Sequence, residues 1–167
     1  MTTRDLRIGF RVSNEFIADN PDVDASAVEV SINFMAVSEL ASSRMESLLA
    51  PLGLRKGGYN LLMVLAGAEG PITPTQIGER IVARGATITG LVNTLVRRGY
   101  AERAPDPNDR RRVLVSITPS GRDVVSDASA VICRSDEELM GIFSEDERER
   151  LIRMLGRLQN HLKKLTT

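Results

Sequence analysis

Apolar residues recur at helical spacing along most of the chain, and the longest such pattern lies in its first third. Steps of three and four positions, typical of one face of a helix, separate Val30, Phe34, Val37, Ala41, Met45, Leu48 and Leu52. Ser26-Ala27-Val28-Glu29 has the spacing of a capping box, in which a serine and a glutamate satisfy each other's backbone N–H groups. We therefore expect a long helix that begins there and stops at Pro51 and Gly53. A weaker helical pattern over residues 1–20 predicts a short helix that ends at Asn20-Pro21.

Three shorter helical patterns follow. The first lies between Gly58 and Gly70, and the second runs from a Thr73–Gln76 capping box to about Val82. After a turn at 83–85, the third covers residues 86–98, with Ile88, Leu91, Val92 and Leu95 on one face and Gly99 at its end. The opposite face of this third helix is small and polar, so it can approach a groove closely.

A basic hairpin is predicted next. Tyr100 to Pro105 forms the outgoing strand, a Pro/Asn/Asp turn carries three consecutive arginines, and Val113 to Ile117 alternates as the returning strand. Thr118-Pro119 supplies the cap and the first residue of a further long helix. A Ser144–Glu147 capping box then opens a last helix, whose stripe consists of Leu151, Leu155, Leu158, Leu162 and Leu165.

This order of elements predicts the fold class. Helix, turn, helix and basic hairpin is the order of a winged helix-turn-helix, so we expect a mainly α protein with a small β-hairpin wing and terminal dimerisation helices. The expected division is 1–56 for N-terminal dimerisation helices, 57–118 for the winged domain and 119–167 for C-terminal dimerisation helices.

Charge is balanced overall but uneven along the chain. The 22 basic and 22 acidic residues cancel, yet from Gln76 to Arg112 eight arginines face four acidic residues. A nucleic-acid partner is therefore indicated locally, for the helix-turn-helix and the hairpin, rather than by a global positive field.

Other chemistry is sparse. One cysteine, Cys133, excludes an internal disulfide framework, and with one histidine, His161, it does not make a metal site. No membrane-spanning apolar run, nucleophile elbow or glycine-rich phosphate loop is present, so we expect a cytoplasmic protein that is not an enzyme and has no cofactor and no metal. We interpret Cys133 as a small buried core residue rather than a peroxide sensor, and His161 as an interface or surface side chain.

The wing residues and those that precede the paired helices resemble the multiple-antibiotic-resistance regulator (MarR) family of bacterial transcription factors. The resemblance covers about residues 26–165 and rests on Asp109-Arg110-Arg111, the run from Val113 to Gly121, and Ile72-Thr73-Pro74. It implies a homodimer with interleaved terminal helices, two winged domains on a palindromic double-stranded DNA operator, and repression relieved by a small-molecule effector.

The DNA contacts expected on this basis lie in the wing and in the recognition helix. In the family the wing aspartate braces the arginine that enters the minor groove, which implies that Asp109 positions Arg111 while Arg110 and Arg112 meet phosphates. On the recognition helix we expect base contacts from Arg84, Thr87, Thr89 and Asn93, and a phosphate contact from Arg97. Capping or solvation of the helix is the alternative role for each of these five residues.

A ligand pocket is implied between the dimerisation and DNA-binding parts. Its candidates are Phe16, Phe34, Ser38, Arg44, Tyr59 and Met63, with Phe34 and Met63 more typical of plain core, and the expected ligand is phenolic or carboxylated. The segment 20–24 is similar to a subgroup that responds to urate and related small anions, with Phe16 where that subgroup has tryptophan. Two alternatives stay open: a winged-helix module that binds protein, and a DNA-binding regulator without a ligand.

Overall fold

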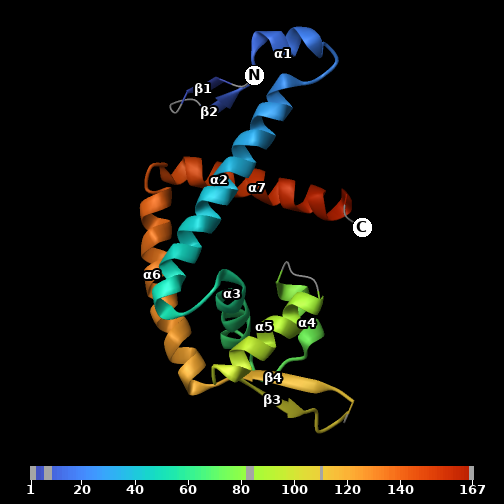
Figure 1. Cartoon of the computed structure of the whole chain (residues 1–167), viewed down its shortest axis with the longest axis vertical. Helices are drawn as coiled ribbons and strands as arrows, with labels where there is room; N and C mark the ends of the chain where they lie inside the picture. The colour runs from blue at the N-terminus through green and yellow to red at the C-terminus, as the bar shows by residue number, and fades with distance from the viewer. Residues whose placement is uncertain (1–2, 6–8, 82–84, 110, 166–167) are drawn as a thin grey trace. The chain divides into compact units, whose positions relative to one another are not determined.

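The computed structural model of the chain describes residues 3–5, 9–81, 85–109 and 111–165. It divides into two compact units, residues 1–60 and residues 61–167. Figure 1 shows the elements that each unit contains: a long helix with a small hairpin at its start in the first, and a helical domain with a β-hairpin followed by two long helices in the second. The expected fold class, mainly α with a small hairpin wing, is confirmed.

The first unit is organised around α2 (Ala25–Leu49). The N-cap of α2 is Asp24, whose Oδ1 accepts hydrogen bonds from the N–H groups of Ser26 and Ala27 at 3.0 and 3.3 Å. The predicted Ser26–Glu29 capping box is therefore wrong, although the predicted start of the helix lies within two residues of the observed one. The Glu29 carboxylate is used elsewhere, on Arg11 and on the N–H of Val12.

The N-terminus is a hairpin followed by one short helix. Strands β1 (Thr3–Asp5) and β2 (Gly9–Arg11) pair antiparallel, and α1 runs from Asn14 to Asp19. The expected helix over 1–20 is thus wrong at residues 3–5 and 9–11. The reason is a long-range contact: Asn33 of α2 accepts from Phe10 N at 2.8 Å and donates to Phe10 O at 2.9 Å, which holds this segment extended.

The end of α2 is followed closely by the start of α3 (Lys56–Ala66). A 3₁₀ turn, η1 (Ala50–Leu52), comes first, and Gly53 takes a left-handed φ of 67°, as expected from Pro51 and Gly53. Glu46 Oε1 then accepts from Lys56 N at 3.1 Å, so a side chain of α2 satisfies a backbone donor in the first turn of α3.

The second unit contains the helix-turn-helix and wing. Helices α4 (Pro74–Arg80) and α5 (Gly85–Arg97) pack together, and strands β3 (Ala101–Pro105) and β4 (Val113–Ile117) form the hairpin. The Thr73–Gln76 capping box at the start of α4 is confirmed. Helix α3 begins two residues before Gly58 and ends four residues before Gly70, so it is shifted towards the N-terminus, and α4 ends two residues before Val82. The largest fully buried side chains described in this unit are Leu61, Leu62, Ile77, Val92, Leu95 and Val115.

The wing hairpin is bonded along both edges of its returning strand. β3 and β4 pair antiparallel from Ala101↔Ile117 to Pro105↔Val113. On the other edge of β4, Ile72 N donates to Val115 O at 3.0 Å and Val115 N donates to Ile72 O at 2.8 Å. The segment before α4 therefore acts as a third strand, and β4 is the central one.

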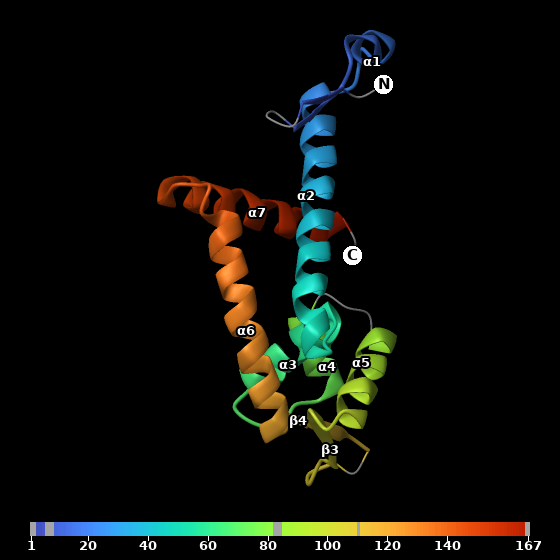
Figure 2. The same cartoon turned by 60° about the vertical axis from the view of Figure 1, so that its left-hand side comes forward.

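Two long helices complete the second unit, and Figure 2 shows α7 turning sharply away from α6. Helix α6 (Pro119–Met140) has Thr118 as its N-cap, as predicted, and α7 (Glu145–Leu165) opens with the predicted Ser144–Glu147 box. Cys133 lies on α6 and is exposed, so its interpretation as a buried core residue is wrong. The buried stripe of α6 passes instead through Val125, Ala128, Ile132 and Ser135.

Candidate nucleic-acid interface

The recognition helix α5 separates an apolar face from a small polar one. Ile88, Val92 and Leu95 are at most 2% exposed and fix the helix to the core. The candidate contacts Thr87, Thr89, Asn93 and Arg97 are all exposed, as expected. A side chain at Gly90 would meet no atom within 4 Å, which leaves this part of the helix surface unusually flat. Arg84, the fifth candidate on this helix, lies outside the described residues.

The C-terminal end of α5 is closed by a glycine turn. Gly99 has a φ of 74°, Gly99 N donates to Val96 O at 2.9 Å, and Tyr100 N donates to Leu95 O at 2.9 Å. This pair of bonds is a Schellman motif, which the position of Gly99 predicted. The chain then enters β3 directly, so α5 leads into the wing without a flexible linker.

The tip of the wing, residues 106–112, is held by its own hydrogen bonds. Asp106 N donates to Arg112 O at 3.1 Å and closes the loop. Asp106 Oδ1 accepts from Asn108 N at 2.9 Å, which is the local bond that aspartate makes in turns. The tip is therefore a defined turn that carries exposed arginines, and not a loose charged loop.

Asp109 contacts both described arginines of the tip, but in different ways. Its Oδ1 accepts from the backbone N of Arg111 at 3.0 Å, and its Oδ2 lies 3.8 Å from Nε of Arg112. Asp109 therefore positions Arg111 through a hydrogen bond to its main chain, whereas the negative charge of Asp109 forms an ion pair with the guanidinium of Arg112. Within the described part of the chain the Arg111 guanidinium has no ion-pair partner. Arg110 lies outside the described residues.

A hollow of about 700 Å³ separates the wing tip from the start of α4. The α4 side presents Thr75, Gln76 and Glu79, and the wing side presents Asp106, Asn108, Arg111 and Arg112. Two acidic and two basic side chains share its rim, so the hollow is polar without a single sign of charge. Arg111 lines this hollow from the wing side.

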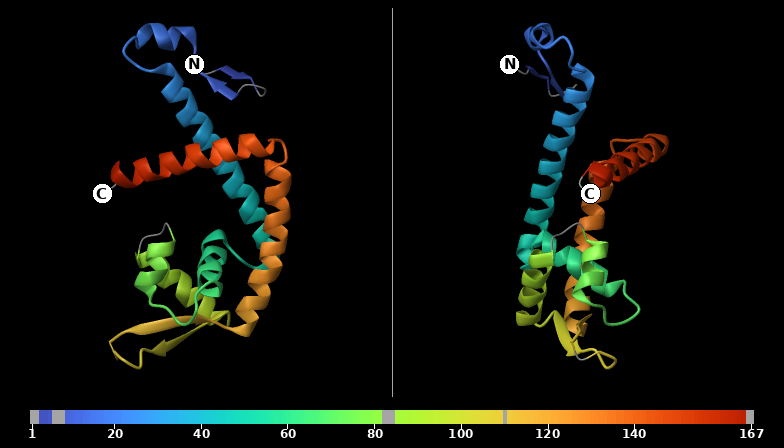
Figure 3. Two further views of the ribbon diagram at one scale, coloured as in Figure 1. Left: turned by 180° about the vertical axis from the view of Figure 1, so that it is seen from behind. Right: turned by 90° about the vertical axis from the view of Figure 1, so that its right-hand side faces the viewer.

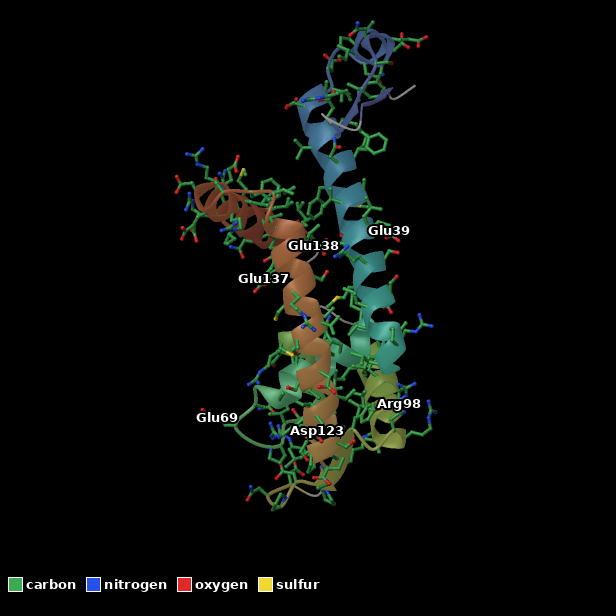
Figure 4. All side chains as sticks on the ribbon, turned by 90° about the vertical axis from the view of Figure 1, so that its left-hand side faces the viewer. Glu39, Glu69, Arg98, Asp123, Glu137 and Glu138 are labelled. Carbon is green, nitrogen blue, oxygen red and sulfur yellow. The ribbon has the colours of Figure 1, made fainter. Side chains whose placement is uncertain are left out.

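Further acidic residues of the second unit lie on α6, in addition to Asp106 and Asp109 beside the wing arginines. Figure 4 shows Asp123 near the start of α6 and Glu137 and Glu138 near its end, whereas Arg98 projects at the end of α5. The positive charge predicted for 76–112 is thus carried by α5 and the wing, and part of its compensation by α6. Charge segregation of this kind orients a domain relative to a polyanion.

The six ligand candidates are spread over three helices. Phe16 lies on α1, Phe34, Ser38 and Arg44 on α2, and Tyr59 and Met63 on α3. Tyr59 is buried, but Phe34 and Met63 are 39% and 44% exposed, so their interpretation as plain core is wrong. Met63 Sδ accepts a hydrogen bond from Ser129 of α6 at 3.3 Å. The pocket itself stays a prediction.

Comparisons with known proteins agree with this geometry. A sequence model described as MarR family matches residues 58–112, which run from α3 to the wing tip. The chain is 28% identical over 142 residues to the transcriptional repressor YetL of Bacillus subtilis (strain 168), with 84% of this chain and 85% of YetL covered. The chain belongs to the MarR family. The resemblance stated from the motifs is thus confirmed.

Two more known proteins extend the match. The transcriptional regulator PecS of Dickeya dadantii (strain 3937) is 26% identical over 146 residues, covering 86% of this chain and 88% of PecS. The apo crystal structure of wild-type MarR from E. coli superposes with a TM-score of 0.64 at 25% identity, covering 75% of this chain and 93% of that one. The family consists of transcription regulators and not of enzymes.

Two searches of the described residues complete the survey. No three His, Cys, Asp or Glu side chains among them are grouped so that they could hold a metal ion. In the same set, every helix is too short or too polar to span a bilayer.

Proposed function

We propose that this chain is a cytoplasmic, homodimeric transcriptional repressor that binds a palindromic operator and is released by a small phenolic or carboxylated molecule. The observation that carries the proposal is the pairing, within one unit, of a flat polar face on α5 with an arginine-bearing wing that is braced by Asp109. The regulators YetL and PecS, each matched over more than four fifths of this chain, support the same function.

The α5 face suits the major groove and the wing suits the minor groove. A helix enters the major groove when its exposed side chains are short enough to let the backbone approach, and Gly90, Thr87 and Thr89 meet that condition. A narrow minor groove has an enhanced negative potential that attracts arginine, and Arg111 extends from a rigid turn. Arg97 and Arg112, exposed beside these elements, would meet phosphates and fix the register.

Exposed apolar faces support the homodimer. In the first unit, α2 leaves Val30, Val37 and Leu40 between 63% and 68% exposed. In the second, α7 leaves Leu155, Leu162 and Leu165 of its predicted stripe exposed, and Ile152 is exposed as well. Rows of exposed apolar side chains such as these are typical of a protein–protein interface. A two-fold dimer would place two recognition helices about 34 Å apart, which is one turn of DNA. In this proposal residues 1–56 and 119–167 serve dimerisation and 57–118 bind DNA.

The ligand response rests on resemblance. Phe16, Phe34, Ser38, Arg44, Tyr59 and Met63 combine aromatic surface, a hydroxyl and a cation, which is the chemistry that a phenolic or carboxylated molecule needs. A thermal-shift screen against small aromatic acids tests this part, and a screen without any stabilised complex would remove it.

Binding to the DNA that flanks the gene tests the core of the proposal. The affinity should fall steeply between two salt concentrations, because each phosphate contact releases counterions. Arg111→Ala should weaken binding severely and lower the salt slope by about one, whereas Arg134→Ala, an equal loss of charge on exposed α6, should leave both unchanged. Unchanged affinity of Arg111→Ala at fixed salt would contradict the role of the wing, and salt-independent or absent binding would favour a winged-helix module that binds protein.

A further inference from the structure

The turn after the recognition helix leaves two backbone carbonyls that the helix itself does not use. In its Schellman motif the N–H groups of Gly99 and Tyr100 point back into α5. The carbonyl groups of the same two residues point away from it, where other parts of the chain can bond them.

Thr118 bonds both of these carbonyls. Its hydroxyl donates to Gly99 O at 2.6 Å, and its backbone N–H donates to Tyr100 O at 3.1 Å. The same hydroxyl oxygen accepts from Gly121 N at 3.0 Å, which is the N-cap bond of α6. One residue thus joins the turn that closes α5 to the first turn of α6, and Figure 3 shows the ends of these elements meeting beside the hairpin.

Close packing reinforces this joint. A Cβ atom added to Gly121 would lie 2.0 Å from Tyr100 O, so the first turn of α6 rests directly on the turn that closes α5. Gly121 is buried. At such a distance α6 cannot slide over the turn without breaking the Thr118 bonds, because packed contacts of this kind have few alternative arrangements.

We propose that Thr118 is a positioning residue for DNA binding, which couples the recognition helix to α6 so that the two helices move as one body. The proposal rests on the proposed function, since positioning matters only if α5 enters a groove. It has a direct consequence: any event that displaces α6 reorients α5 without touching a DNA-contacting side chain.

Spin labels test the joint independently of DNA. The exposed Cys133 on α6 takes one label, and Gly90→Cys on α5, where a side chain meets open space, takes the other. The labelled chain is refolded with an excess of unlabelled chain, so that the measured pair belongs to one protomer. Pulsed EPR then gives the width of the distance distribution between α5 and α6.

Three variants separate the joint from the cap. Thr118→Ser keeps the hydroxyl, so its distribution should match that of the unsubstituted protein. Thr118→Asp still caps α6 but cannot donate to Gly99 O, so its distribution should broaden. Ser144→Ala removes the equivalent cap of α7 and should leave the distance distribution between the labels on α5 and α6 unchanged. An unbroadened distribution in Thr118→Asp overturns the joint.

A second measurement needs no substitution and covers the case in which Thr118→Asp does not fold. If α5 and α6 move as one body, the amide hydrogens of Tyr100, Thr118 and Gly121 should exchange with solvent through one common opening. Faster exchange at Thr118 and Gly121 than at Tyr100 overturns the joint.

DNA binding tests the positioning role. Thr118→Val should bind the flanking DNA about tenfold more weakly than Ser144→Ala, a loss equal to that of one base-edge contact. If the Thr118→Val protein shows a broadened distance distribution but binds DNA with unchanged affinity, the positioning role is overturned. If the unsubstituted protein binds no DNA, the proposed function fails, while the label distribution still decides whether the joint exists.

Discussion

At the scale of single residues, Asp109 divides its two oxygens between a backbone N–H and a guanidinium, and this division can be tested. Asp109→Asn keeps an oxygen that accepts from Arg111 N but loses the negative charge that pairs with the Arg112 guanidinium. Asp109→Ala loses both. We expect Asp109→Ala to bind DNA more weakly than Asp109→Asn in a titration at fixed salt, although both remove the same negative charge from the interface. Equal affinities would show that the backbone bond does not position Arg111.

Glu29 makes the N-terminal hairpin sensitive to acid. The side-chain hydrogen bond from Arg11, followed by that from Val12 N, lowers the pKa of Glu29 below its ordinary value of 4.5. A carboxylate with a depressed folded pKa stabilises the fold above its unfolded pKa, and this stability is lost as pH falls through the folded pKa. We expect the NMR signals of Val12 and Phe10 to shift below pH 4.5, and Glu29→Gln to abolish that shift. A shift that persists in Glu29→Gln would assign it to another group.

Some features of single residues could be predicted from the sequence, and others depend on contacts that the sequence does not reveal. Asp24 could have been recognised as the cap of α2, but Ser26 and Glu29 offered an equally good local pattern. Only the distant contact of Glu29 with Arg11 and Val12 decides between them. Cys133 was misread for a different reason: its neighbour Ile132 is buried, yet adjacent residues of a helix face directions about 100° apart.

At the scale of elements, two glycines of the second unit should respond oppositely to alanine. Gly121→Ala places a Cβ against Tyr100 O and should lower the free energy of unfolding by about 1–3 kcal/mol, the usual cost of overpacking. Gly90→Ala adds a side chain in open space within a helix and should raise it by about 0.5–1 kcal/mol. Chemical denaturation of both variants checks this pair. Stabilisation of both variants by a similar amount would mean that helix propensity, and not the Tyr100 contact, dominates at Gly121.

Most elements of the second unit were predictable because their signals are local. Capping boxes at Thr73 and Ser144, the Thr118-Pro119 start and the Gly99 end all combine a specific residue with a fixed offset. The N-terminal hairpin was not predictable in this way. Its extended backbone is stabilised by Asn33, 23 residues away from Phe10, while its own sequence carries a weak helical period.

At the scale of the whole molecule, the uncovered faces of α2 and α7 lead us to expect a dimer in solution. Leu155→Glu places a charge on the apolar stripe of α7 and should shift the protein towards monomer in sedimentation equilibrium. Asn160→Asp, on the face of α7 opposite the stripe, adds the same charge at an exposed position and should remain dimeric. A dimer that survives Leu155→Glu unchanged would exclude this face of α7 from the interface.

The central position of β4 bears on how such a protein can change its preference for DNA. Because Ile72 bonds one edge and β3 the other, the register of the wing is fixed below the tip, and the Asp106–Arg112 bond closes the loop above it. Insertions or deletions between 106 and 112 would then lengthen or shorten the reach of Arg111 while the strands stay aligned. The length and sequence of the tip can therefore vary while the fold of the domain stays the same, so natural variation in the tip can change which operators the protein binds.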